Sequence, residues 1–266
     1  FRPLQEEIIN AVIQQKDTLA LLPTGGGKSI CFQIPALAMD GICIVVSPLV
    51  ALIQDQVANL KANGIKAIAL TGGLRNDEIG TLLDNCVYGD YKFLYLSPER
   101  LQQEIIQERI KQMPVNLIAV DESHCISQWG NDFRPAYRNI NTLRELLPTI
   151  PCIALTATAT PKVIQDIEEN LHLKDVQRFQ QSFTRENLAY TVLETENKIL
   201  TIEKTLRKYP QSCIVYVRNR KSTVMIHEAL QRKGFTSLYF HGGLSSEEKK
   251  VALQKWLNGK VQTIVA

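Results

Sequence analysis

Leu22-Pro23-Thr24-Gly25-Gly26-Gly27-Lys28-Ser29 stands between two apolar runs. The run before it, residues 17–22, predicts a short buried strand, and residues 30–34 predict the start of a buried helix. Glycines at such a junction let the backbone curl, so that consecutive N–H groups and the positive end of the helix point at one anion. We therefore predict a cradle for the phosphates of a nucleotide, formed by Thr24, Gly25, Gly26, Gly27, Lys28 and Ser29.

Each polar group of this cradle has an expected task. Lys28 would reach the β- and γ-phosphates, and the hydroxyl of Ser29 would hold Mg²⁺. The strict phosphate-loop pattern has glycine where Leu22 stands, which weakens a generic nucleotide-kinase interpretation but leaves the phosphate site intact. The alternative is a flexible glycine turn with a solvated lysine.

The length and amino-acid composition are those of an ordinary globular protein. The chain has 266 residues, of which 45% are hydrophobic and 21% charged, enough for one large or two ordinary domains. The net charge of +3 is uneven: residues 1–183 carry 16 Lys and Arg against 20 Asp and Glu, and residues 184–266 carry 14 against 7. The basic second part indicates either a nucleic-acid face or lysine-rich solvated helices.

Cysteine usage and hydropathy indicate the compartment. The six cysteines stand singly, with no C-x-x-C spacing, which predicts reduced core residues and neither a disulfide framework nor a zinc site. Without a leader or a run of about 18 apolar residues, membrane spanning and secretion are unsupported. We expect a cytoplasmic protein, associated with the nucleoid if it is bacterial. The chain starts at Phe1 and stops in the apolar residues 263–266, so we expect both ends to be cut.

Apolar runs alternate with helical patterns along the first part of the chain. This alternation predicts an α/β fold with a mostly parallel sheet covered on both faces, whose ligands gather at the carboxyl ends of the strands. The pattern restarts near residues 181–186, so we predict domains at 1–183 and 184–266, the second incomplete. The predicted strands are 17–22, 42–46, 67–70, 93–96, 117–120 and 152–155, then 188–193, 213–217, 237–240 and one from 261; helices at 197–209, 222–233 and 245–257 separate the last four.

Two adjacent carboxylates follow the apolar residues 117–120. Asp121 is expected to bind Mg²⁺, directly or through water, and Glu122 to orient and deprotonate an attacking water. The alternative is an ordinary helix start with acids at the positive end of the dipole.

Serine or threonine residues follow three other predicted strands directly. Thr160 before Pro161 has the form of a helix N-cap, and Ser47-Pro48 and Ser97-Pro98 share it. For the two Ser-Pro segments, contact with the phosphate backbone of a nucleic acid is an open alternative. Thr156 and Thr158 lack that explanation, so their hydroxyls are expected to link the Asp121 strand to a nucleic acid.

A loop rich in aromatic and turn residues, 127–135, follows the carboxylates. Trp129 and Phe133 could simply belong to the hydrophobic core. A segment that also contains Gly, Asn, Asp and Pro is, however, a poor core segment. An aromatic side chain and an arginine on a loop suit stacking on unpaired bases. We therefore predict contacts to single-stranded nucleic acid from Gln128, Trp129, Phe133 and Arg134.

Together these segments resemble the superfamily 2 helicases, and among them closely the RecQ family, from end to end of the chain. Phe1-Arg2-Pro3-x-Gln5 resembles the adenine-reading motif of the family, which implies that Arg2 and Gln5 contact the base. Residues 23–33 resemble its phosphate loop, in which a non-glycine at the position of Leu22 is normal. Residues 121–130 resemble its acidic box and aromatic-rich loop, which implies a catalytic role for His124; Ser123 stands where the family usually has alanine.

The resemblance implies two RecA-like domains that hold ATP and Mg²⁺ and step 3′-to-5′ along single-stranded DNA. Forked DNA substrates, roles in DNA repair and recombination and a monomeric state are expected with it. In the second domain residues 214–220 match a motif that implies a DNA contact by Arg220, although Arg218 departs from the common asparagine; residues 239–244 match the next. The arginine that reaches the γ-phosphate would follow Ala266, so we expect these residues alone to hydrolyse ATP feebly and not to unwind duplex.

Three functions stay open on the sequence. A helicase and a translocase that moves without separating strands are not distinguished by it. A nucleotide-gated DNA-binding or scaffold module without turnover is opposed by Lys28, Asp121 and Glu122. The preference for DNA over RNA rests on the resemblance, because stacking and phosphate contacts tolerate both sugars.

Overall fold

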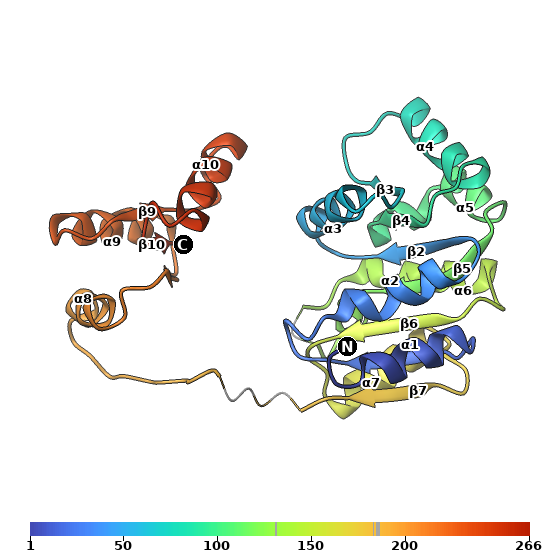
Figure 1. The fold of residues 1–266 in the computed structure, drawn as a ribbon, viewed down its shortest axis with the longest axis horizontal. Coiled ribbons are helices and arrows are strands. Elements are labelled where there is room, and N and C mark those ends of the chain that lie inside the picture. Colours follow the sequence, from blue (N-terminus) through green and yellow to red (C-terminus); the bar gives the residue numbers. More distant parts are fainter. Residues whose placement is uncertain (131, 183, 185–186) are drawn as a thin grey trace. The chain divides into compact units, whose positions relative to one another are not determined.

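The computed structural model describes residues 1–130, 132–182, 184 and 187–266. The chain is divided into two compact units, residues 1–185 and 186–266. The predicted junction between residues 183 and 184 involves Phe183, which lies outside the described residues. Each unit is an α/β structure of its own (Figure 1), as the alternating pattern predicts.

The described residues of the first unit form a seven-stranded sheet in the order β3-β4-β2-β5-β6-β1-β7. Every pair of neighbouring strands is parallel, so all carboxyl ends meet at one edge. The strands are β1 (Thr18–Leu21), β2 (Ile42–Val46), β3 (Ala67–Leu70), β4 (Phe93–Leu96), β5 (Val115–Val120), β6 (Cys152–Thr156) and β7 (Gln177–Gln180).

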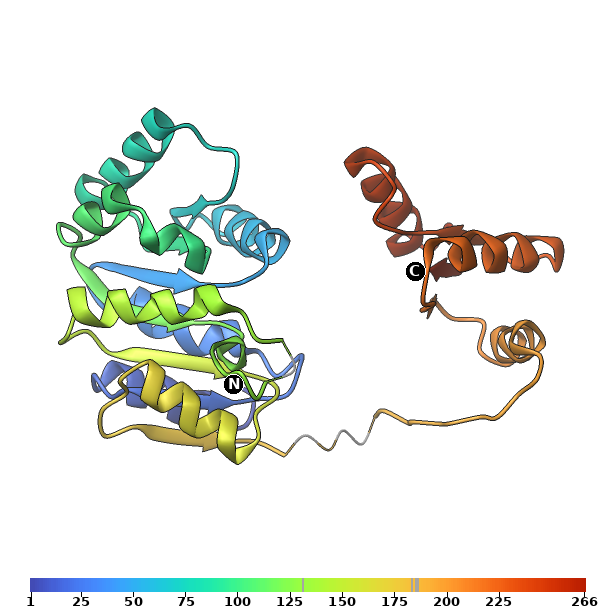
Figure 2. The same cartoon turned by 180° about the vertical axis from the view of Figure 1, so that it is seen from behind.

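Helices cover both faces of this sheet, because successive side chains of a buried strand point to opposite faces and both faces are apolar here. On one face Leu19 and Ile44 pack with α4 (Asn76–Tyr88), α5 (Glu104–Ile110), α6 (Asn141–Leu146) and α7 (Pro161–Asn170). On the other, Ala20 and Val45 pack with α1 (Gln5–Ile13), α2 (Lys28–Ala38) and α3 (Val50–Ala62). The two layers are seen from opposite sides in Figures 1 and 2. Short 3₁₀ helices η1 (Pro98–Gln102), η2 (Ser123–Ile126) and η3 (Pro135–Ile140) lie between strands and helices.

The second unit is smaller. Its described residues form a parallel sheet in the order β8-β10-β9, with a small core that contains Leu206, Leu230 and Val265. The elements are α8 (Lys198–Lys208), β8 (Cys213–Val215), α9 (Arg220–Arg232), β9 (Ser237–Tyr239), α10 (Ser246–Leu257) and β10 (Thr263–Val265). Within the described ranges, no helix combines the length and apolarity that a membrane span requires.

Two predictions about local structure were wrong, and a third was confirmed only in its position. Residues 188–193 form no strand: Tyr190 and Val192 are 90% and 95% exposed, and an alternating apolar segment becomes a strand only beside a partner strand. Ser47 is not a helix cap, because α3 begins at Val50. Ser97 occupies the cap position of η1, yet its side chain makes no capping hydrogen bond.

One predicted helix cap forms, and one strand forms that the sequence did not predict. The cap by Thr160 is confirmed, since its side chain accepts a hydrogen bond from the N–H of Val163. Sequence reasoning missed β7, which pairs with β1 through its backbone while most of its side chains are exposed. Polar edge strands of this kind carry no apolar signature.

Candidate nucleotide and nucleic-acid site

The glycine turn leaves β1 at the carboxyl edge of the sheet. The N–H of Leu22 donates to the Thr156 carbonyl at 3.1 Å, which ties the end of β1 to the end of β6. Gly25 and Gly27 have φ angles of 77° and 79°, in the left-handed region that favours glycine. A Cβ on Gly26 would lie 2.8 Å from the Pro23 carbonyl oxygen. Because α2 begins at Lys28, its first N–H groups lack intrahelical acceptors, and the turn fits a phosphate group.

Arg2 and Gln5 contact this turn from the N-terminal segment. The buried Gln5 side chain donates from Nε2 to the carbonyls of Gly27 at 3.1 Å and Gly26 at 3.4 Å, and its Oε1 accepts from the N–H of Arg2 at 2.8 Å. The guanidinium of Arg2 donates to the Gly25 carbonyl. A Cβ on Gly27 would collide with the Gln5 amide, so the absence of a side chain there permits this close approach. Both residues therefore brace the turn, and their contact with a base stays a prediction.

The acidic pair lies at the end of β5, in the middle of the same edge. The N–H of Asp121 donates to the Val46 carbonyl at 2.9 Å, and the Tyr137 hydroxyl donates to the Asp121 carbonyl at 2.8 Å. Glu122 adopts a left-handed φ of 46°, and its N–H donates to Asp121 Oδ1 at 3.0 Å. The backbone thus turns sharply between the two carboxylates. Sequence reasoning missed Tyr137, which no local motif connects to the pair.

Burial, and after it the charge of Glu122, raises the pKa of Asp121 from its ordinary value of 3.8 to about 6. The hydrogen bond from the Glu122 N–H and the positive charge of Lys28 act in the opposite direction. Lys28 therefore lies close enough to Asp121 to influence its ionisation, although the two follow different strands. This brings the predicted phosphate lysine and the predicted metal-binding carboxylate together at one edge.

Ser29, the other predicted metal ligand, is half-buried and lines a hollow between α2 and α3 that also contains Gln33 and Gln56. Hydroxyl and carboxylate oxygens are the hard ligands that Mg²⁺ takes in proteins, so Ser29 and Asp121 fit that ion by their chemistry. Their joint binding of one ion stays a prediction.

His124 and Thr156 connect the acidic segment to β6. The Nδ1 atom of His124 lies 2.9 Å from Thr156 Oγ1 and 3.4 Å from Glu122 Oε2. Thr156 Oγ1 also donates to the Thr158 carbonyl at 3.2 Å and accepts from the Thr158 N–H at 3.1 Å. The hydroxyl of Thr156 thus faces the acidic segment, and a nucleic-acid contact by Thr156 or Thr158 stays a prediction.

The aromatic loop presents one large side chain to solvent. Trp129 is 70% exposed, and Gln128 beside it is exposed too. Ser127 anchors the loop: its Oγ accepts from the Trp129 N–H at 3.1 Å and donates to Asp166 Oδ2 at 2.6 Å. An exposed tryptophan on an anchored backbone suits stacking on a base.

The other predicted residues of this loop are engaged within the protein. Arg138 lies over the ring of Phe133, with 5.6 Å between the guanidinium carbon and the ring centroid. Arg134 donates to the Pro48 carbonyl at 2.9 Å and pairs with Asp132 at 3.3 Å. Asn131 lies outside the described residues. Nucleic-acid contacts by Phe133 and Arg134 stay predictions.

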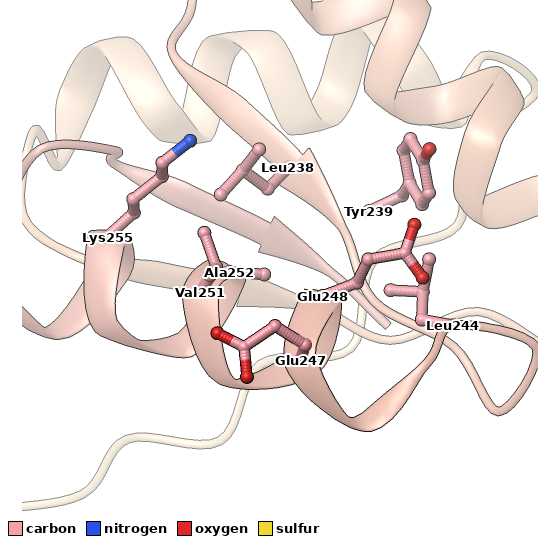
Figure 3. A pocket seen from close by; sticks show the side chains of 8 residues that line it. All are labelled: Leu238, Tyr239, Leu244, Glu247, Glu248, Val251, Ala252 and Lys255. Carbon is pink, nitrogen blue, oxygen red and sulfur yellow. The ribbon is translucent and has the colours of Figure 1, made fainter.

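In the second unit Arg220 begins α9 and reaches the turn before α10, where its Nη1 would lie 3.3 Å from a Cβ on Gly243. A pocket of about 280 Å³ lies between β9 and α10 (Figure 3). It contains none of the predicted site residues, and its lining combines apolar side chains with two glutamates and one lysine: Leu238, Tyr239, Leu244, Glu247, Glu248, Val251, Ala252 and Lys255.

A parallel sheet with a glycine-rich turn from its first strand into a helix defines the class of phosphate-loop nucleotide-binding proteins. The family model of the DEAD/DEAH box helicases matches residues 2–167, and the chain belongs to this family. The model of the helicase conserved C-terminal domain matches residues 197–266.

Curated relatives confirm the resemblance to RecQ helicases. The chain is 42% identical to the ATP-dependent DNA helicase RecQ of Bacillus subtilis over 100% of the chain and 46% of that protein. It is 38% identical to RecQ of Haemophilus influenzae, over 100% of the chain and 43% of the relative. For the probable ATP-dependent DNA helicase RecS of Bacillus subtilis the identity is 39%, over 99% of the chain and 54% of the relative. The chain thus spans about half the length of these relatives.

Solved structures confirm the fold. The helicase domain of Pyrococcus furiosus Hef superposes with a TM-score of 0.66 at 15% identity, over 100% of this chain and 85% of that one. The DUF1998 helicase MrfA, in a structure bound to DNA, superposes with a TM-score of 0.75 at 16% identity, over 98% of this chain and 39% of that one.

Proposed function

We propose that the first unit binds ATP and Mg²⁺ at the carboxyl edge of its sheet. The backbone of residues 24–27 holds the phosphates, Lys28 neutralises the β- and γ-phosphates, and Ser29 and Asp121 hold the ion. Bound Mg²⁺ supplies charge neutralisation on the phosphate oxygens. Glu122 orients and deprotonates the attacking water, and His124 connects this carboxylate to Thr156. The observation that carries the proposal is that the glycine turn, which leaves β1, and Asp121, which follows β5, lie at the same carboxyl edge of the sheet with only β6 between their strands.

We further propose that the protein is a DNA helicase, which uses this hydrolysis to move 3′-to-5′ along single-stranded DNA and to separate strands at forks. The exposed Trp129 supports the proposal, because it lies on the loop that follows the acidic pair and η2 and offers a stacking surface. The printed names of the relatives describe them as ATP-dependent DNA helicases. A monomer that acts in DNA repair and recombination, in the cytoplasm or on the nucleoid, completes the proposal.

Residues 1–266 alone are proposed to hydrolyse ATP feebly. The matched relatives are about twice as long, and an arginine that reaches the γ-phosphate contributes roughly 10³–10⁵ in rate in related enzymes. A DNA-stimulated turnover of about one per second or more from these residues would contradict this, since kinases with a complete set of groups reach about 1–100 per second.

The decisive experiment is strand displacement by the protein at its natural length. A fork with a 3′ single-stranded tail should be separated in the presence of ATP and Mg²⁺, and the same fork with a 5′ tail should not. Stimulation of ATP hydrolysis by DNA without displacement would instead identify a translocase, and nucleotide binding without hydrolysis would identify a gated binding module.

A further inference from the structure

Three donor atoms of different chemistry meet beside the acidic pair. One ring nitrogen of His124, Cys125 Sγ and a carboxylate oxygen of Asp132 all lie within 4.8 Å of one another. The Sγ atom lies 3.8 Å from His124 Nε2, and the Cys125 thiol donates to Asp132 Oδ2 at 3.9 Å. His124 and Cys125 belong to η2, whereas Asp132 comes from the aromatic loop. The singly placed cysteines gave no sign of this cluster, because its members approach one another only through the bend of the loop.

The two separations that involve Cys125 Sγ are close to those around a tetrahedral zinc ion. Bonds of about 2.3 Å to sulfur and about 2.0–2.2 Å to nitrogen or oxygen place neighbouring ligand atoms about 3.6 Å apart. The observed sulfur–nitrogen and sulfur–oxygen distances of 3.8 and 3.9 Å exceed this by a few tenths of an ångström. The His124 nitrogen and the Asp132 oxygen lie within 4.8 Å of each other, so rotation of these side chains has to close this third separation before all three atoms reach one ion.

The hydrogen bonds of Thr156 prepare His124 for this role. The Thr156 hydroxyl lies 2.9 Å from His124 Nδ1 and 3.2 Å from the Thr158 carbonyl, so a hydrogen bond engages Nδ1 while the Thr158 carbonyl can take the hydroxyl proton. The other ring nitrogen, Nε2, lies 3.8 Å from Cys125 Sγ, and an ion bound there requires the tautomer that carries its proton on Nδ1. A hydrogen bond from the second ring nitrogen is the usual support of a metal-binding histidine.

We propose that His124, Cys125 and Asp132 form a binding site for Zn²⁺ or a similar thiophilic divalent cation, with solvent as the fourth ligand. Cys125 is buried and Asp132 is exposed, so an ion can enter along the carboxylate. Because sulfur binds such an ion as the thiolate, binding replaces the Cys125 thiol proton by the ion and releases that proton to solvent. Mg²⁺ does not compete, because it prefers oxygen ligands.

A bound ion would link the aromatic loop, through Asp132, to the segment after the acidic pair, through His124 and Cys125. Arg134, which pairs with Asp132 at 3.3 Å and donates to the Pro48 carbonyl, holds the loop now. Binding of the ion needs no nucleotide, although the site shares His124 with the proposed hydrolytic machinery. Its failure in an experiment therefore leaves the proposed function untouched.

Cobalt titration tests the site directly. The 266-residue chain, freed of metal with a chelator, is titrated with Co²⁺ in a large excess of Mg²⁺. We expect one Co²⁺ per chain, with the sulfur-to-cobalt charge-transfer band and the strong visible bands of tetrahedral coordination, and displacement of both by Zn²⁺.

Matched variants assign the ligands. Cys125→Ser should abolish the charge-transfer band, and Asp132→Ala, at an exposed position, should weaken binding at least about tenfold. Thr156→Val, which removes the support of His124, should weaken it about 10–100-fold. Cys86→Ser is the control, because Cys86 is also buried but lies on α4, and it should leave the spectrum unchanged. Absence of the band, or a band that survives in Cys125→Ser with its circular dichroism intact, would overturn the proposal.

Discussion

Lys28, which begins the helix after β1, lowers the pKa of Asp121, which follows β5, across the carboxyl edge of the sheet. The influence opposes burial and the charge of Glu122, which together raise that pKa to about 6. The two residues are 93 positions apart in the chain (121 − 28), and β6 lies between their strands in the sheet. Their proximity is therefore a product of the strand order.

Lys28→Ala is expected to abolish ATP hydrolysis by the protein at its natural length, a loss of at least about a hundredfold, because it removes the positive charge that faces the phosphates. The measurement is phosphate release with and without single-stranded DNA. Lys61→Ala, at an exposed lysine in the last turn of α3, is the matched control. An unchanged rate in Lys28→Ala would remove the glycine turn from the mechanism.

Asp121→Asn is expected to stabilise the fold while it impairs Mg²⁺ binding. The rise in the pKa of Asp121 from 3.8 to about 6 corresponds to a cost of about 3 kcal/mol, because the folded state holds the proton more tightly than the unfolded state. Above about pH 6 the carboxyl is ionised in both the folded and the unfolded state, and burial destabilises the folded state by this full amount. Below about pH 4 the carboxyl is protonated in both states, and the destabilisation vanishes.

The free energy of unfolding should accordingly rise by about 1–3 kcal/mol in Asp121→Asn near neutral pH, and by little near pH 4. Urea denaturation at the two pH values measures it. A stabilisation of equal size at both, or a loss of stability at neutral pH, would show that burial of the Asp121 charge is not the dominant effect.

Trp129→Ala is expected to weaken binding of single-stranded DNA by about 1–3 kcal/mol, roughly 5- to 150-fold, because stacking on one base is lost. The free energy of unfolding should hardly change, since the side chain is 70% exposed. Fluorescence anisotropy of a labelled oligonucleotide measures the affinity. Tyr88→Ala on α4 removes an aromatic group that is 79% exposed, and equal losses in the two variants would argue against a specific role for Trp129.

Asp17→Ala is expected to lower the free energy of unfolding by about 3–5 kcal/mol, because it leaves a buried arginine without its counter-ion. The carboxylate of Asp17 accepts from Arg144 at 2.8 Å, from the Cys152 N–H at 2.7 Å and from the Lys174 N–H at 2.8 Å. These bonds fasten α6, β6 and the segment before β7 to the start of β1. Glu108→Ala breaks an exposed pair with Lys111 and should cost less than about 1 kcal/mol; a similar cost for both would show that the buried bonds contribute little.

The amino-acid sequence by itself determined the layered α/β fold of the first unit. Buried parallel strands are continuous apolar runs, such as residues 42–46 and 93–96, and each was recognisable without knowledge of its neighbours. The glycine turn and the Asp121-Glu122 pair were recognisable for the same reason, because a local motif carries their chemistry. Where a strand depends on a partner strand, the local pattern failed. It predicted a strand at residues 188–193 that does not form, and it did not predict β7.

Tertiary structure alone decided which polar groups meet. Tyr137 supports Asp121, Gln5 fills the space left by Gly27, and Asp132 returns to His124 and Cys125, although no spacing in the chain announces any of these contacts. Strand order and loop bends set such distances, and they depend on the packing of the whole sheet. Periodicity records which face of an element is buried, whereas the partner of a polar side chain is fixed only when the elements have packed.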